Sequence, residues 1–172
     1  MDVNQEANGS RSQNSYHDHT VCLSKVLDHA RQICTERGVQ LTPIRFQVLT
    51  LICDSHKAVK AYDLLDKIKP LQPAAKPATI YRALDFLLDQ GLIHRIESLN
   101  AFFGCDHSGH RHEQLMLICK HCEEVEERPA NNVMNMLSQE LQLAGFSEYS
   151  KTIEIQGICS KCALLNKQPA FS

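Results

Sequence analysis

Residues 76–96, KPATIYRALDFLLDQGLIHRI, contain the most informative structural pattern in the chain. Pro77 stands where a helix begins, apolar residues then recur at helical spacing, and Gly91 occupies the position after the helix end. Residues 92–103 follow as two short strands around Ser98-Leu99-Asn100. A strong amphipathic helix running directly into a hairpin predicts the recognition helix and wing of a winged helix-turn-helix domain.

The segments before this stretch support the same interpretation. A helical apolar pattern begins near Cys22 and ends at Gly38, and Thr42-Pro43 marks the N-cap and first position of a second helix. A third, short helix is expected over residues 61–69, ending before Pro70. Three helices, a recognition helix and a hairpin therefore form the expected N-terminal domain.

The second half has a different pattern, predicted as β-β-α-β. Residues 114–118 and 123–128 are expected strands, residues 133–145 a helix, and residues 152–156 a half-buried strand with Ile153 and Ile155 on one face. This region is small for an independent core and would gain stability from a metal and from dimerisation.

The fold class is therefore α+β, with an N-terminal winged helix-turn-helix domain and a small C-terminal α/β dimerisation domain. The expected divisions are a disordered tail (1–20), the winged-helix domain (21–103), a metal-ligating hinge (104–112), the dimerisation domain (113–165) and a second tail (166–172).

Composition narrows the function classes. The chain has 172 residues, 43% of them hydrophobic, and eight Cys and nine His. It has no apolar run of membrane-spanning length and no signal-peptide pattern at residues 1–20, so we expect a cytoplasmic protein without a membrane partner. Eight cysteines in a reducing compartment indicate metal or redox chemistry more than disulfides.

The formal net charge of −2 hides a segregation of charge. Residues 20–104 contain 11 Lys and Arg against 8 Asp and Glu, whereas residues 105–172 contain 6 against 9. A mildly basic helical domain beside an acidic sheet domain is consistent with one domain meeting phosphates and the other a metal.

Two Cys-x-x-Cys pairs form the first metal constellation, Cys119/Cys122 and Cys159/Cys162. Each pair can turn two sulfurs toward one ion, and two pairs complete the closed tetrahedral geometry of structural zinc. The alternative is a buried or redox-active dithiol, as in a thioredoxin-like oxidoreductase. Two pairs that each follow a strand of one small domain favour structural zinc, so we expect no enzyme.

A second, looser group of candidate metal ligands is spread over the wing, the hinge and the acidic strand. Its candidate ligands are His94, Cys105, His107, His110, His112 and Glu126 or Glu127. One thiolate with imidazoles and a carboxylate suits zinc better than iron or manganese. Spacing does not decide which histidines bind, and a solvated His-rich loop is the alternative.

The expected recognition helix leaves polar side chains on its outer face. These are Thr79, Tyr81, Arg82 and Asp85. An arginine near the start of such a helix can pair with guanine or grip phosphate. Lys76, at the helix start, and Tyr62 and Arg45, on earlier helices, are expected to position the DNA backbone.

These motifs together resemble the ferric uptake regulator (Fur) family. The resemblance rests on Leu41-Thr-Pro-Ile-Arg45, Ala61-Tyr-Asp-Leu-Leu65, Lys76-Pro-Ala-Thr-Ile-Tyr-Arg-Ala-Leu84, the His/Cys-rich hinge and the paired Cys-x-x-Cys. It covers about residues 24–165. Three stretches look most like its zinc-sensing branch, the zinc uptake regulators (Zur), namely Ala61–Asp63, Tyr81–Leu88 and Ile93–Ser98.

The resemblance implies a bacterial homodimer that, with zinc bound, binds a palindromic operator on double-stranded DNA and represses zinc-uptake genes. It implies two zinc ions per chain, one structural on the four paired cysteines and one regulatory on His94, Cys105, His112 and Glu127. The hinge departs from the denser His-rich run of the iron regulators, which leaves a third metal site open and His110 or His107 as substitutes for, or additions to, His112.

Three other interpretations are compatible with these motifs. An iron- or peroxide-responsive regulator of the same family is the nearest, and Cys105 argues against it. A redox enzyme or a zinc-storage protein would not show metal-dependent DNA binding. Asp66 and Lys69 suit an i,i+3 pair on a helix surface, or a bridge between two dimers on one operator.

Overall fold

Four helices form the first part of the chain, which a computed structural model describes over residues 19–54, 57–105, 114–147 and 151–165. The helices are α1 (His19–Glu36), α2 (Pro43–Cys53), α3 (Ala61–Ile68) and α4 (Pro77–Asp89). Pro43 and Pro77 begin their helices as predicted. Gly38 and Gly91, with φ of +65° and +67°, follow helix ends in the left-handed conformation that glycine adopts without strain. Thr42 has the extended backbone of an N-cap, but its side chain makes no capping hydrogen bond.

The helices enclose one apolar core. Its centre is α2, whose buried Val48, Leu49 and Ile52 meet the inner face of α4, including Leu84 and Leu87. Each such side chain contributes about 1.5–3 kcal/mol through removal from water. The recognition helix is therefore held rigidly, with its polar residues left outward.

The predicted hairpin follows α4 at once. Strands β1 (Ile93–Ile96) and β2 (Ala101–Gly104) pair antiparallel, with His94 opposite Phe103. A 3-10 turn, η1 (Glu97–Leu99), and Asn100 in the left-handed conformation make the tip. These residues form the wing, which spans residues 93–104.

The second part is a three-stranded sheet in the order β4-β3-β5. Its elements are β3 (Gln114–Cys119), β4 (Val125–Pro129), α5 (Asn131–Leu143), β5 (Ile153–Gly157) and α6 (Ser160–Leu165). Strands β3 and β4 are antiparallel, whereas β3 and β5 are parallel, so α5 supplies the crossover that a parallel pair requires. The β-β-α-β prediction is confirmed, and α6 is an addition that its six residues were too few to signal.

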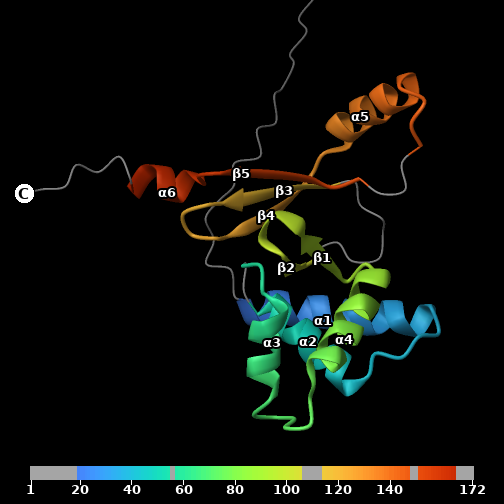
Figure 1. Ribbon diagram of the computed structural model, residues 1–172, viewed down its shortest axis with the longest axis vertical. Coiled ribbons are helices and arrows are strands. Elements are labelled where there is room, and N and C mark those ends of the chain that lie inside the picture. The colour runs from blue at the N-terminus through green and yellow to red at the C-terminus, as the bar shows by residue number, and fades with distance from the viewer. Residues whose placement is uncertain (1–18, 55–56, 106–113, 148–150, 166–172) are drawn as a thin grey trace, which may run out of the picture.

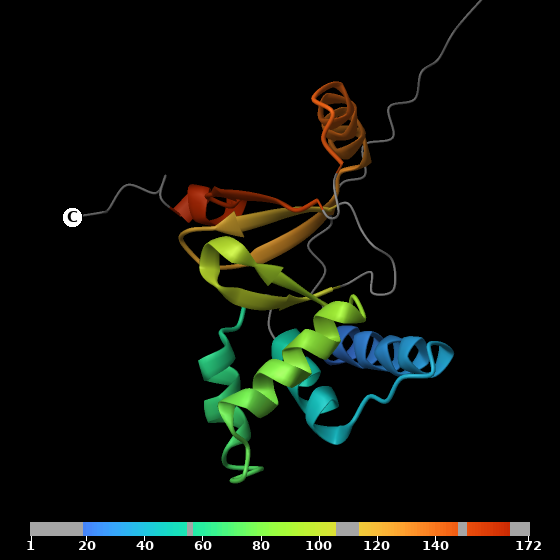
Figure 2. The same ribbon diagram turned by 45° about the vertical axis from the view of Figure 1, so that its right-hand side comes forward.

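The wing lies between the helices and the sheet (Figures 1 and 2). A second buried cluster joins it to the sheet, with Ile96 and Phe103 from the wing and Met116, Ile118 and Val125 from the sheet. An isolated backbone bridge between Lys57 and Glu124 adds a further link. The two parts therefore share a continuous apolar contact through the wing.

The other face of the sheet differs from the expectation for β5. The alternation of Ile153 and Ile155 is present, but Ile155 is 51% exposed, so among the described residues this side of β5 is not covered at that position. The opposite face, which carries Met116, meets the wing. Among the helices of the described ranges, none is long and apolar enough to cross a membrane.

Several residues for which the sequence made predictions lie outside the described ranges, so the structure does not test those predictions. They concern the tail at residues 1–18, the C-terminal tail, and His107, His110 and His112 of the hinge.

Candidate functional site

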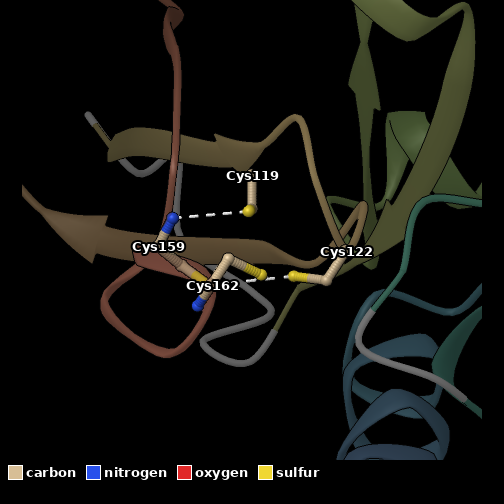
Figure 3. Close-up of side chains that lie close together, drawn as sticks. All are labelled: Cys119, Cys122, Cys159 and Cys162. Carbon is tan, nitrogen blue, oxygen red and sulfur yellow. Dashed lines mark hydrogen bonds between the residues drawn. The ribbon is translucent and has the colours of Figure 1, made fainter. Parts of the chain in front are cut away.

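The four paired cysteines come together at one end of the sheet (Figure 3). Cys119 ends β3 and Cys122 lies in the turn that follows. Cys159 precedes α6 and Cys162 lies within it. The parallel register of β3 and β5 pairs Cys119 with Gly157, which brings the two Cys-x-x-Cys motifs side by side.

The sulfur geometry fits a tetrahedral thiolate site. All four Sγ atoms lie within 4.8 Å of one another, and the Sγ atoms of Cys122 and Cys159 are 3.8 Å apart. Four sulfurs held at about 2.3 Å from one zinc ion would stand about 3.8 Å apart. The cluster therefore has the dimensions of a structural zinc site.

Electrostatics also favour a cation at this position. The Cys159 backbone N–H donates to Cys119 Sγ at 3.3 Å, and this bond, with those from Cys122 and His121, lowers the pKa of Cys119 to about 6. The neighbouring sulfur of Cys159, burial and the remaining thiols raise the pKa of Cys162 to about 12. Four sulfurs this close cannot all be thiolates without a positive charge among them, and a divalent metal supplies it.

The second cluster joins three elements that are distant in sequence. His94 comes from β1, Cys105 follows β2, and Glu127 comes from β4. His94 Nε2 lies 3.1 Å from Glu127 Oε1, and the Cys105 thiol donates to the same oxygen at 3.8 Å. Their ligand atoms all lie within 4.8 Å of one another.

Burial makes this cluster chemically unusual. The Glu127 side chain is 2% exposed and Cys105 is 1% exposed. A carboxylate removed from water is costly unless a positive charge or hydrogen bonds compensate it, and a thiolate beside it adds to that cost. A metal ion coordinated by imidazole, thiolate and carboxylate satisfies all three side chains. The structure distinguishes Glu127 from Glu126, which is exposed and pairs with Arg128 at 2.6 Å.

The outer face of α4 agrees with the expected nucleic-acid surface at most positions. Tyr81, Arg82 and Asp85 are exposed, and Tyr62 on α3 is 72% exposed. Tyr62 and Tyr81 line one groove of about 260 Å³ with residues of the wing. This surface presents aromatic and basic groups from the recognition helix, α3 and the wing together.

Two candidate DNA contacts are engaged within the protein. Thr79 is half-buried, and its hydroxyl accepts a weak hydrogen bond from the Lys76 backbone N–H at 3.5 Å. Arg45 donates to the Gln40 carbonyl at 2.6 Å and lies 3.7 Å over the Phe86 ring. Their placement stabilises the starts of α4 and α2 against the core.

Sequence reasoning missed Glu154. The alternating pattern of the strand predicts a polar, solvent-facing side chain at Glu154. In the structure its carboxylate accepts hydrogen bonds from the backbone N–H groups of Glu97 and Ser98 in the wing. The only sequence signal is an acidic residue between Ile153 and Ile155, which carries no information about a contact more than fifty residues away.

A family model described as the ferric uptake regulator family matches residues 36–156, most of the chain. The chain belongs to the ferric uptake regulator family. This member of the family is 40% identical over 139 residues to the zinc uptake regulation protein of Escherichia coli (strain K12). The matched region covers 80% of this chain and 81% of that protein.

Solved structures of the family show the same fold. A zinc uptake regulator complexed with zinc and DNA has 38% identity and a TM-score of 0.80, covering 85% of this chain and 98% of that one. Holo XcZur has 42% identity and a TM-score of 0.76, covering 83% and 99%. Apo XcZur, at 39% identity and the same coverage, has a TM-score of only 0.50. At nearly equal identity, this family member therefore has the overall arrangement of the holo structure.

Proposed function

We propose that this member of the ferric uptake regulator family is a zinc-responsive transcriptional repressor, active as a homodimer in the bacterial cytoplasm. The observation that carries the proposal is the cluster of His94, Cys105 and Glu127, which unites the wing and the sheet around one buried position. The likeness of the chain to the zinc uptake regulation protein of Escherichia coli supports zinc as the metal. The related structure complexed with zinc and DNA supports zinc and DNA as the ligands.

Two zinc ions per chain fit the described residues. The four cysteines would hold the structural ion, and His94, Cys105 and Glu127 would hold the regulatory ion, with His112 proposed as the fourth ligand. Zinc at the regulatory position would supply the positive charge that lets the thiolate and carboxylate coexist. Both sets of ligands bind in their deprotonated forms, so occupancy should fall as pH falls.

The mechanism follows from which elements carry the regulatory ligands. His94 and Cys105 lie at the wing and move with the recognition helix, because β1 follows α4 after only three residues. Glu127 lies on the sheet. Ligands drawn from both parts bind one ion only when the wing sits on the sheet, so metal occupancy selects one orientation of the recognition helix. By linkage, DNA binding strengthens metal binding by the same factor.

A second copy of the chain is the proposed cover for the exposed apolar face. Large apolar side chains on this part of the molecule are exposed, namely Val133, Met136, Leu143, Phe146, Ile155, Ile158, Leu164 and Leu165. A hollow of about 550 Å³ lies among β3, β4 and the end of β5. Large apolar side chains that gather on the surface of a soluble protein commonly mark an interface with another protein chain. We therefore assign residues 113–165 to dimerisation, residues 21–103 to DNA binding and residues 104–112 to the hinge.

The dimer would present two recognition helices to a palindromic operator on double-stranded DNA. The two major-groove segments that these helices would enter lie about 34 Å apart on the operator, which is one turn of DNA. Arg82 and Tyr81 are the proposed base contacts, and Tyr62, Lys76, Thr79 and Arg45 the proposed backbone contacts. Of these, Thr79 and Arg45 would need to contact DNA while keeping their internal bonds. The exposed Asp66 and Lys69 on or next to α3 stay available for a contact between two dimers on one operator.

The decisive experiment measures binding of the chain to candidate zinc-uptake promoter DNA by fluorescence anisotropy. We expect binding with zinc, loss with a chelator, and weaker zinc response in Cys105→Ser, because one of the described regulatory ligands is lost. Iron and manganese serve as comparisons, since an iron- or peroxide-responsive regulator would prefer iron or manganese. Equal binding with chelator and with zinc would refute the proposed function, and a Cys105→Ser response equal to wild type would refute the ligand assignment.

A further inference from the structure

Three residues form one row across the sheet, on the face that meets the wing. The strand registers place Glu127 of β4 opposite Met116 of β3, and Met116 opposite Glu154 of β5. Residues paired in register point to the same face of a sheet. The row therefore consists of a buried methionine flanked by two carboxylates.

All three members of this row contact the wing region. Met116 packs in the buried cluster with Ile96 and Phe103. Glu127 meets His94 and Cys105 in the regulatory cluster. Glu154, on the opposite strand, reaches the wing tip, so the two carboxylates hold different ends of the same hairpin.

The Glu154 contact is bidentate and specific. Its Oε1 accepts from the backbone N–H of Glu97 at 2.6 Å, and its Oε2 accepts from the backbone N–H of Ser98 at 3.0 Å. These two N–H groups open the 3-10 turn and have no carbonyl partner within it. Hydrogen bonds to an ionised acceptor are stronger than those between neutral groups.

The carboxylate is stabilised in its charged form at this position. Burial by itself would raise the pKa of Glu154, but hydrogen bonds from the Ser98 side chain and from the backbone of Ser98 and Glu97 outweigh it and keep the pKa below its ordinary value. At neutral pH, Glu154 is therefore an anion that holds the wing without any metal.

We propose that Glu154 is a positioning residue for the metal switch: it holds the wing tip against the sheet independently of zinc and so raises the fraction of chains in which the regulatory ligands are already together. The inference rests on the proposed function. Because apparent affinity equals intrinsic affinity multiplied by the competent fraction, a partly closed apo protein needs less zinc to bind DNA.

The first test measures the free zinc concentration at half-maximal DNA binding, in zinc-buffered solutions, for wild type, Glu154→Ala and Glu154→Gln. Gln156→Ala is the matched control, because Gln156 lies on the same strand and the same face and is exposed. We expect the midpoint to rise about tenfold in Glu154→Ala, less in Glu154→Gln, whose amide oxygen can still accept, and not in Gln156→Ala. A Glu154→Ala midpoint equal to that of Gln156→Ala would overturn the proposal.

A second readout separates positioning from general stability and from the proposed function. Amide hydrogen exchange is followed in the segment 97–100 of the full-length protein whose regulatory zinc has been removed. Faster exchange in Glu154→Ala than in wild type, with unchanged zinc content of the cysteine cluster and unchanged dimer mass, is expected. Unchanged exchange would overturn the proposal, whereas zinc-independent DNA binding by wild type would overturn the proposed function and leave the exchange result to be judged alone.

Discussion

Met116→Ala should weaken the zinc response as well as the fold. Met116 is 2% exposed and lies at the centre of the cluster shared by the wing and the sheet. Truncation of a buried methionine to alanine costs about 2–5 kcal/mol, through lost burial and the cavity left behind. Here part of that cost falls on the closed arrangement itself, because the lost contacts with Ile96 and Phe103 exist only while the wing sits on the sheet.

The matched control is Met134→Ala. Met134 is fully buried as well, but it lies on α5 and belongs to neither side of the wing contact. Urea denaturation should give destabilisation of about 2–5 kcal/mol for both variants. Only Met116→Ala should also raise the free zinc concentration needed for half-maximal DNA binding, by about tenfold for each 1.4 kcal/mol that falls on closure. If the two variants are equally destabilised, remain dimeric and need the same free zinc concentration for half-maximal DNA binding, the buried cluster between the wing and the sheet does not couple zinc binding to DNA binding.

Three further predictions follow from the same geometry. Cys119→Ser should release one zinc per chain and abolish the dimer, because Cys119 ties β3 to the end of β5; zinc analysis with light scattering would expose the error if the variant stays dimeric and fully metallated. Arg82→Ala should weaken specific DNA binding by about 1–3 kcal/mol while non-specific binding changes less, and an unchanged ratio of specific to non-specific affinity would remove Arg82 from base readout. Because the pKa of Glu154 is lower in the folded protein, its contribution to stability is present above the ordinary carboxyl pKa and is lost as pH falls through the folded value; unfolding measurements should therefore show wild type and Glu154→Gln converging in acid, and a constant gap would contradict the assignment.

Local signals allowed much of the fold to be predicted. Pro43 and Pro77 mark helix starts through a backbone constraint that acts at the residue itself, and Gly38 and Gly91 follow helix ends where φ is positive. The two Cys-x-x-Cys motifs were identifiable because each brings two ligands together over a single turn. The short α6 was missed, since six residues carry too little periodicity to distinguish a helix from a loop.

The candidate regulatory site was predicted only in part. The residue types alone left Glu126 and Glu127 open, and only the family resemblance favoured Glu127. In the folded protein the choice depends on which side of β4 faces the wing, and a shift of one residue in register would reverse it. The internal bonds of Arg45 and Thr79 were equally invisible, because a polar side chain on a helix face reads the same whether it meets solvent or a neighbouring element.

The helix starts and ends, the hairpin and the four-cysteine motif could be predicted from the sequence alone, because they depend on backbone geometry and spacing within a few residues. The row of Glu127, Met116 and Glu154 beneath the wing, in contrast, is apparent only in the folded protein. That row exists because strand register and the packing of the wing bring together residues far apart in the chain. Contacts of this kind are set by the burial of whole faces, which no short stretch of sequence encodes.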